Sequence, residues 1–354
     1  MEGSGRVMQG RGQCPNCPVI VANFHRMDAK NVNEISTLPK VDSIVIGRNE
    51  GARLAACLAS LAGQTRRVIY VDSGSTDGSP ALAASLGATV IALDMTRPFT
   101  AARARNAGLA ALAVDAPDYV QFVDGDCAVD AGWIGTALAF LATTPAAVVV
   151  CGRRRERFPE ASIYNRLCDQ EWDTPIGQAL ACGGDALMRF AAVQAVGGYS
   201  DDLIAGEEPE LCLRLGRNGG QIWRIDAEMT LHDAAITRLG QWWKRSKRAG
   251  HAFAEGAARH GTGPERHWVK ETRRALLWGL GVPLLALALA LLWWPLGALV
   301  LLAWPAQGVR LALRTGDWPA AFFAVLGKLA EAQGALGYYW GRLTSRRARI
   351  IEYK

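Results

Sequence analysis

The sequence lacks the features that mark several common classes of protein. Only 20% of its 354 residues are charged and 50% are hydrophobic, which excludes a disordered, collagen-like or coiled-coil chain. The net charge is only +6 and no base-reading motif accompanies it, so nucleic acid is not an expected partner. No Gly-rich phosphate loop follows Val41, which argues against a nucleotidyltransferase.

The N-terminus has no charged segment followed by an apolar one, so there is no sign of a secretory signal peptide. The 8 cysteines are scattered and fit a reducing cytosol. Cys14 and Cys17 form a CxxC pair, but a zinc site needs about four ligands and no second CxxC or HxxxH follows. We expect residues 1–40, which are rich in Gly, Asn and Pro, to form a flexible N-terminal extension.

From Val41 onward, short β-branched runs alternate with segments rich in Ala and Leu. This alternation predicts an α/β fold with a Rossmann-like, mostly parallel sheet and helices on both faces. After Gly152 the alternation fades, and we assign residues 41–238 as a whole to one domain. The expected strands cover 43–46, 68–71, 89–93, 119–123 and 147–150, and the expected helices cover 52–61, 80–86, 101–112 and 133–141.

Polar residues follow two of the expected strands at the points where ligands bind in open α/β sheets. The first group is Asp72 to Gly78, which could also be an ordinary turn that caps the next helix. The second is Asp124-Gly125-Asp126. Its two carboxylates can converge on one Mg²⁺ or Mn²⁺, because Gly allows a sharp turn and these hard cations prefer oxygen ligands.

Five blocks of the sequence, in this order, resemble the glycosyltransferases of family 2. The resemblance extends from Val41 to about Asp233, and five ordered blocks are far more specific than any one of them. It implies the nucleotide-sugar-binding GT-A fold, with a UDP-sugar as the family's commonest donor. The blocks are Ile46 to Glu50, Asp72 to Asp77, Ala104 to Gly108, Asp124 to Asp126, and Gly206 to Leu211.

The resemblance also implies roles at the donor. Asp72 would recognise the nucleotide base, and Arg105 would lie near the donor nucleotide, with Asn49 and Glu50 of the first block also expected at the donor. Arg103 is two positions from Arg105 and therefore lies on another helical face, so we interpret it as part of a solvated helix surface.

The same resemblance places a metal at the DxD motif. Asp124 and Asp126 would hold the ribose and the Mg²⁺ or Mn²⁺ bound to the diphosphate. A divalent ion is suited to this position because the departing diphosphate builds up negative charge. His232 is a candidate metal ligand, because a late histidine often completes the metal shell of GT-A enzymes; the alternative is a hydrogen-bonded structural histidine.

Three acidic residues, Glu207, Glu208 and Glu210, lie around an expected helix start, where they could simply complement the helix dipole. The resemblance places the catalytic general base in this block. The base is usually the Asp of a Glu-Asp pair, which aligns with Glu208, one methylene longer; Glu207 is the fallback. Asp185 lies in a stretch that in relatives is near the acceptor, and could otherwise be a turn residue.

From Ala275 to Val309 there are 35 consecutive residues without Asp, Glu, Lys or Arg, more than the roughly 20 that one membrane-spanning helix needs. Basic residues flank this run on both sides, which favours a transmembrane helical hairpin over 275–313. A single tilted span and a re-entrant or interfacial helix pair are the alternatives. We expect basic and aromatic interfacial helices over 239–274 and an amphipathic basic tail over 314–354.

These features predict a membrane-attached, inverting glycosyltransferase at the cell inner membrane, with its catalytic domain in the cytoplasm. It would transfer a sugar from a nucleotide-sugar donor to a saccharide or lipid-linked acceptor in cell-envelope or exopolysaccharide synthesis. A polyprenyl-phosphate glycosyltransferase and a noncatalytic membrane scaffold that retains the fold are the alternatives.

Overall fold

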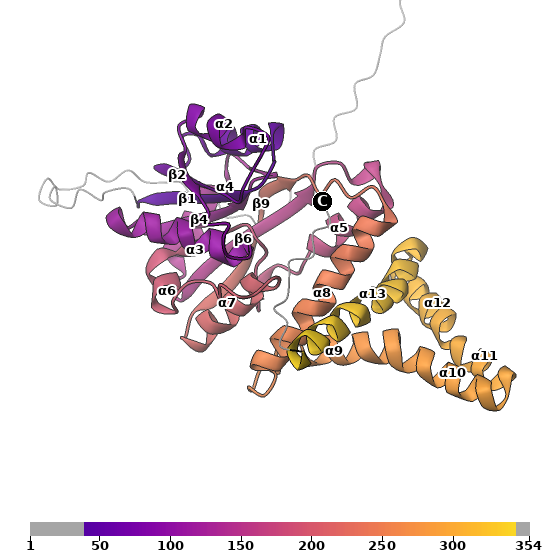
Figure 1. Cartoon of the computed structure of the whole chain (residues 1–354). Helices are drawn as coiled ribbons and strands as arrows, with labels where there is room; N and C mark the ends of the chain where they lie inside the picture. Colours follow the sequence, from indigo (N-terminus) through magenta and orange to yellow (C-terminus); the bar gives the residue numbers. More distant parts are fainter. Residues whose placement is uncertain (1–38, 345–354) are drawn as a thin grey trace, which may run out of the picture. The chain divides into compact units, whose positions relative to one another are not determined.

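The computed structural model describes residues 39–344. The proposed N-terminal extension up to Leu38, its CxxC pair and the last ten residues of the C-terminal tail lie outside the described residues. Residues 39–344 belong to one compact unit, in which an α/β part is followed by a series of helices (Figure 1).

The first part of the α/β fold is a parallel sheet. Strands β3, β2, β1 and β4 lie side by side in this order, and each is separated from the next in sequence by a helix. The observed boundaries agree with the predicted ones to within about two residues. The elements are β1 (Val41–Gly47), α1 (Ala52–Leu61), β2 (Arg67–Asp72), α2 (Ser79–Ser85), β3 (Thr89–Ala92), α3 (Ala101–Leu112) and β4 (Tyr119–Asp124).

The second part completes a mixed sheet in the order β3-β2-β1-β4-β8-β6-β9-β5, with β7 beside β9. Strand β8 runs antiparallel to both β4 and β6, whereas β6 and β9 are parallel. The sheet is therefore less parallel than predicted, because the regular strand-helix crossovers end after β4. The elements are β5 (Cys127–Val129), α4 (Trp133–Thr143), β6 (Ala147–Glu156), α5 (Ile163–Trp172), β7 (Gly177–Ala179), β8 (Ala186–Arg189), α6 (Phe190–Ala195), α7 (Glu207–Arg217) and β9 (Gln221–His232).

The core of the α/β part holds α3 close against the sheet. Ile44 of β1 and Phe122 of β4 are fully buried. Gly108 of α3 lies over β1, where a Cβ atom would come within 2.6 Å of the Ile44 side chain, so only glycine permits this approach. The buried Trp133 indole donates to Gln121 Oε1 at 2.8 Å, which satisfies both polar groups in the core. This packing fixes α3, which carries Arg105, relative to the end of β4.

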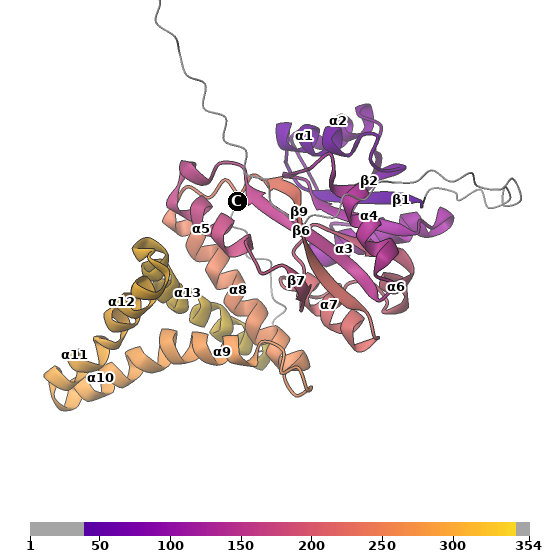
Figure 2. The same ribbon diagram turned by 180° about the vertical axis from the view of Figure 1, so that it is seen from behind.

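Beyond the sheet, the chain continues in helices. Helix α13 packs against α8 (Figures 1 and 2). The two helices approach closely at Gly250 and Gly334, where a Cβ atom would lie 1.9 Å from a backbone oxygen of the other helix. The helices are α8 (Leu239–His260), α9 (Val269–Leu276), a π-helical turn (Leu277–Gly281), α10 (Val282–Leu292), α11 (Trp294–Leu301), α12 (Ala303–Thr315) and α13 (Trp318–Leu343).

Two continuous helical runs, Val269–Leu292 and Trp294–Thr315, are long and apolar enough to cross a membrane. At about 1.5 Å per residue, each would be roughly 33 to 36 Å long. They form a helical hairpin, because Gly297 of the second run lies against Ala290 of the first and Trp304 Nε1 donates to the Trp278 carbonyl at 3.2 Å. Most of their apolar side chains are exposed.

Candidate functional site

The guanidinium of Arg105 joins the end of β4 to the start of α7. Its Nη2 lies 2.9 Å from Asp124 Oδ1 and 2.9 Å from Glu208 Oε1, and its Nη1 lies 3.0 Å from Glu207 Oε1. The Arg105 side chain is only 3% exposed and lies over the ring of Tyr199. One buried cation therefore holds together the first carboxylate of the DxD motif and the two acids of α7.

The acidic residues in the first turn of α7 have different partners. Gly206 precedes the helix with a φ of 80°, a left-handed conformation that suits glycine. Glu207 and Glu208 point to Arg105, whereas Glu210 pairs with Arg214 at 2.7 Å. Glu210 also accepts a hydrogen bond from Ser200 at 3.0 Å. The acidic block is thus a pair at the site and one residue that anchors the helix.

The surroundings of Glu208 distinguish it from an ordinary surface acid. Burial, together with the nearby charge of Glu207, raises the pKa of Glu208 to about 7, although Arg105 acts in the opposite direction. Burial alone would lower the pKa of Arg105, but the surrounding carboxylates keep it well above its usual value. A carboxylate with a pKa near neutrality beside a permanent cation is suited to accept a proton.

Asp185 accepts a hydrogen bond from the backbone of Asp124. The backbone N–H of Asp124 donates to Asp185 Oδ1 at 3.0 Å, and Thr230 Oγ1 donates to Asp185 Oδ2 at 2.8 Å. Asp185 is completely buried. Its predicted position near the acceptor remains untested, but its oxygens in this structure hold the end of β4 in place. The adjacent Gly184 leaves room for this arrangement, since a Cβ atom there would lie 2.6 Å from Asp124 Oδ2.

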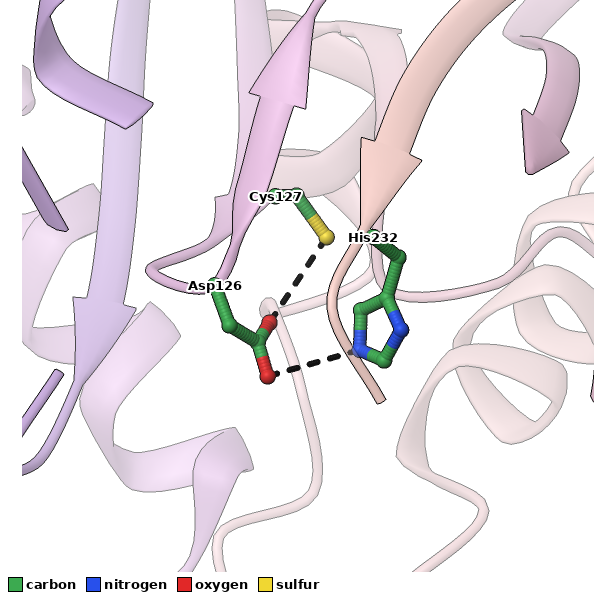
Figure 3. A group of neighbouring side chains, drawn as sticks. All are labelled: Asp126, Cys127 and His232. Carbon is green, nitrogen blue, oxygen red and sulfur yellow. Dashed lines mark hydrogen bonds and ion pairs between the residues drawn. The ribbon is translucent and has the colours of Figure 1, made fainter. Parts of the chain in front are cut away.

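Asp126, Cys127 and His232 form a buried cluster beside this point (Figure 3). His232 Nε2 lies 3.4 Å from Asp126 Oδ2, and Cys127 Sγ lies 3.7 Å from Asp126 Oδ1. The cluster forms because Cys127 of β5 and His232 of β9 are paired in the antiparallel ladder. Asp124 belongs to a neighbouring group with Cys127 and Asp185, so the predicted ligands of one metal are divided between two adjacent groups.

The donor atoms around His232 fit a hard divalent cation. Burial lowers the pKa of His232, so its ring is neutral near pH 7 and has a lone pair available. Its Nδ1 has no hydrogen-bond partner within the described part of the chain, although Glu156 Oε2 is 3.6 Å away. Burial also raises the pKa of the Cys127 thiol, which keeps it protonated and a poor ligand. Carboxylate oxygen and neutral imidazole nitrogen remain, a donor set that suits Mn²⁺ or Mg²⁺.

Three residues predicted at the donor, Asp72, Asn49 and Glu50, lie in two linked turns. Asp72 Oδ2 accepts from the backbone N–H groups of Gly74 and Ser75 at 3.0 and 2.9 Å. The Asn49 backbone N–H donates to Ser75 Oγ at 2.9 Å, so the turns after β1 and β2 are tied together. Glu50 pairs with Arg53 of α1 at 2.8 Å. The structure places these residues at the carboxyl ends of two adjacent parallel strands.

Sequence reasoning missed two neighbours of the site. Arg154 lies 3.4 Å from both Asp124 Oδ2 and Asp185 Oδ2, and its guanidinium is over the ring of Trp172. Trp172 in turn meets the His232 ring edge to face at 4.7 Å. The predicted strand ended at residue 150, whereas β6 continues to Glu156, so its position in the sequence did not mark Arg154 as a site residue.

The prediction for Arg103 was wrong. Its side chain is buried rather than solvated, and its guanidinium donates to the backbone carbonyls of Asp94, Arg97 and Pro98 at 2.7 to 3.1 Å. The loop before α3 folds back over the helix and needs a donor for these carbonyls. Arg103 therefore stabilises that loop, and only Arg105 points to the site, as expected.

Many of these site residues fall within a stretch of the sequence that matches a known family. Residues 43–194 match the family model described as glycosyl transferase family 2. The chain carries a glycosyl transferase family 2 domain. The match includes the turns after β1 and β2, Arg105, the DxD motif and Asp185, and it ends before the acid pair of α7.

Curated relatives of this family 2 domain share modest identity. The pre-mycofactocin glycosyltransferase of Mycobacterium tuberculosis is 27% identical over 240 residues, which cover 62% of this chain and 48% of that protein. The succinoglycan biosynthesis protein ExoA of Rhizobium meliloti is 27% identical over 212 residues, 55% of this chain and 64% of that protein. The matches thus span less than two thirds of either relative.

Solved structures show the same fold. The mannosyltransferase PcManGT from Pyrobaculum calidifontis, solved with GDP-Man and Mn²⁺, superposes with a TM-score of 0.60 and 21% identity over 87% of this chain and 89% of that one. Residues 1–349 of TarS from S. aureus give a TM-score of 0.50 and 15% identity over 85% and 92%. The predicted GT-A fold of the family 2 domain is confirmed.

Proposed function

We propose that this protein transfers a sugar from a nucleotide-sugar donor to an acceptor hydroxyl with inversion at the anomeric carbon. The observation that carries this proposal is the Arg105 cluster, in which Asp124 and Glu208 both lie 2.9 Å from one nitrogen. The donor end of a glycosyl transfer needs cations and a metal, and its acceptor end needs a base. This cluster brings the candidates for both ends together.

Glu208 is the proposed base, with Glu207 as the alternative. Its carboxylate would take the proton of the acceptor hydroxyl while that oxygen attacks the anomeric carbon opposite the leaving diphosphate. Arg105 keeps the carboxylate oriented, and the raised pKa of Glu208 makes it a stronger base than an exposed glutamate. Glu207, on the other nitrogen of Arg105, balances its charge.

Asp126 and His232 would hold the Mn²⁺ or Mg²⁺, with Asp124 beside them. When bound, the ion supplies positive charge that stabilises the diphosphate leaving group. Glu156 Oε2 lies 3.6 Å from His232 Nδ1, and Asp185 holds the backbone of Asp124. Asp72, Asn49 and Glu50 would contact the nucleoside. PcManGT was solved with GDP-Man and Mn²⁺, which supports a nucleotide sugar and a divalent ion as the ligands to test first; a UDP-sugar is our first choice of donor.

We place the protein at the inner membrane with residues 41–238 as the catalytic domain facing the cytoplasm. Residues 239–274 would lie at the interface, 275–313 would be the membrane hairpin, and 314–354 would form the basic tail. The two exposed apolar runs support this placement. The acceptor would be a saccharide or a lipid-linked molecule of envelope or exopolysaccharide synthesis, and the name of ExoA as a succinoglycan biosynthesis protein supports testing that class.

The proposal is tested by measuring the binding of a panel of nucleotide sugars to detergent-purified protein, with and without Mn²⁺. We expect one donor class to bind only with Mn²⁺, and Asp126→Ala to abolish that binding. Radiolabel transfer from this donor to membrane extracts then tests catalysis. A folded protein that binds no donor and transfers no sugar would contradict the proposal and favour a noncatalytic scaffold.

A further inference from the structure

A groove of about 1000 Å³ lies between α7 and the beginning of α9. One wall is a face of α7 that includes Pro209, Leu213 and Gly216, and the other is formed by residues 265–277. Residues 178–181 close one side. Pro209 directly follows Glu208, so the groove begins beside the acid pair.

The α9 wall of the groove is strongly cationic. Arg266, Lys270, Arg273 and Arg274 are all exposed, and none of the four side chains forms a salt bridge or hydrogen bond with another residue of the described range 39–344. Four unpaired cations in one wall create a positive potential that attracts an anion.

Charge on the remaining lining is largely balanced. Arg217 is neutralised by Glu265 at 2.7 Å, and Glu271 is the other acidic residue of the lining. The groove therefore keeps a clear excess of positive charge that comes from α9 and the turn before it.

The same groove exposes apolar surface, and a buried polar atom lies in its wall. Leu180 is 94% exposed on one side of it and Leu277 is 59% exposed at the end nearest the apolar helix α10. His267 Nε2 is buried without a hydrogen-bond partner among the described residues. A ligand that joins a phosphate to a hydrocarbon chain would use the cations and the leucines together.

Trp268, which lines the groove, also packs against the residue that precedes the acid pair Glu207 and Glu208. The indole of Trp268 lies against Gly206, where a Cβ atom would come within 2.5 Å of it. It also fills the space beside Gly256 and meets Phe253 at 5.3 Å. Trp268 of the α9 wall therefore packs against the residue that immediately precedes Glu207 and Glu208.

We propose that this groove binds the phosphate of a lipid-linked acceptor, with Lys270, Arg273 and Arg274 on the phosphate and the hydrocarbon chain running along Leu277 towards α10. This assignment rests on the proposed glycosyl transfer and names the acceptor class for it. The alternative ligand is a soluble phosphate compound, which would contact the cations but would have no hydrocarbon chain to pack against the exposed leucines.

The test compares Lys270→Gln/Arg273→Gln/Arg274→Gln with a matched control, Arg310→Gln/Arg314→Gln. Arg310 and Arg314 flank the other end of the apolar hairpin and are also exposed, but they do not line the groove. Full-length proteins are titrated with phosphatidylcholine vesicles that contain a minor fraction of polyprenyl phosphate, the same fraction of phosphatidylglycerol, or neither. Inorganic phosphate and diphosphate are added as soluble competitors.

We expect wild type and the control to prefer polyprenyl phosphate over phosphatidylglycerol, and the groove variant to lose about tenfold or more of its affinity for polyprenyl phosphate. Equal losses in the groove and control variants, or no preference between the two anionic lipids, would overturn the proposal and leave a general headgroup contact. Complete displacement by soluble phosphate would assign the site to a soluble compound. Mn²⁺-dependent donor binding, measured on the same samples, reports folding and tests the proposed transfer reaction separately.

Discussion

Arg105 and Glu208 form a buried ion pair, with 2.9 Å between Nη2 and Oε1, that links helix α3 to the first turn of α7. The pair places a carboxylate of raised pKa beside the end of β4, where the DxD motif begins. The two residues belong to different blocks of the sequence, and their contact exists only in the folded chain. The predictions below follow from this arrangement and its surroundings.

Glu208→Gln should retain Mn²⁺-dependent donor binding and lose sugar transfer by roughly 10² to 10⁴-fold, because the amide cannot accept the acceptor's proton. Donor affinity by calorimetry and single-turnover transfer measure the two effects. Glu207→Gln is the matched control and should keep more activity. Transfer at the wild-type rate by Glu208→Gln, with an inactive Glu207→Gln, would assign the base to Glu207.

The transfer rate should rise with pH through about 7. Glu208 must be deprotonated to act as a base, and its pKa is raised to about 7, so it is mostly protonated in mildly acidic solution. The pH profile of kcat/KM, with donor binding measured over the same range, tests this expectation. A rate that stays constant from about pH 5 to pH 8 would argue that the base has an ordinary carboxylate pKa.

Gly184→Ala should weaken donor binding and transfer, whereas Gly183→Ala should be close to wild type. A Cβ atom on Gly184 would lie 2.6 Å from Asp124 Oδ2 and 2.9 Å from Arg105 Nη2, so the cluster must shift. A Cβ atom on Gly183 meets only the end of the Arg154 side chain, at 3.9 Å. Donor titrations of both variants measure the difference. Equal behaviour would show that the cluster adapts without loss.

Arg105→Met should destabilise the fold by about 3 to 5 kcal/mol, because it leaves buried carboxylates without their cation. The double variant Arg105→Met/Glu208→Gln should recover part of this loss, since it removes one of the unpaired charges. Thermal and urea unfolding measure both values. If the double variant is less stable than Arg105→Met, then charge repulsion is not the cause of the instability.

His232→Ala should lower the affinity for Mn²⁺ on the order of tenfold or more, and Glu156→Gln should have a smaller effect in the same direction. His232 would bind the ion through Nε2, while Glu156 lies behind its Nδ1. Direct Mn²⁺ titration followed by electron paramagnetic resonance measures the affinity without requiring turnover. Unchanged affinity in His232→Ala would leave His232 as a structural residue.

Local sequence patterns predicted the first part of the fold well. The helices over 52–61 and 101–112 coincide with α1 and α3, because strand-helix alternation is encoded by short-range hydrophobic periodicity. The antiparallel insertion of β8 between β4 and β6 was not predictable in this way. It depends on long-range pairing, which leaves no local signal.

The site was predictable where a family motif named the residue and less so elsewhere. Arg105 was expected near the donor, but its contact with Glu207 and Glu208 depends on how α7 meets α3. Arg154 was not predicted, since one arginine in a run of three carries no distinguishing pattern. Arg103 was misjudged because helical spacing alone does not reveal a loop that folds over the helix.

In the proposed membrane placement, the contact between Trp268 and Gly206 would link the hairpin to the proposed catalytic base. Helices that are longer than the bilayer is thick respond by tilting, so the angle of the run that starts at Val269 would depend on lipid chain length. Trp268 immediately precedes this run and lies against Gly206, beside the proposed base. The turnover of the reconstituted protein is therefore expected to vary with bilayer thickness, while its affinity for the nucleotide sugar stays constant.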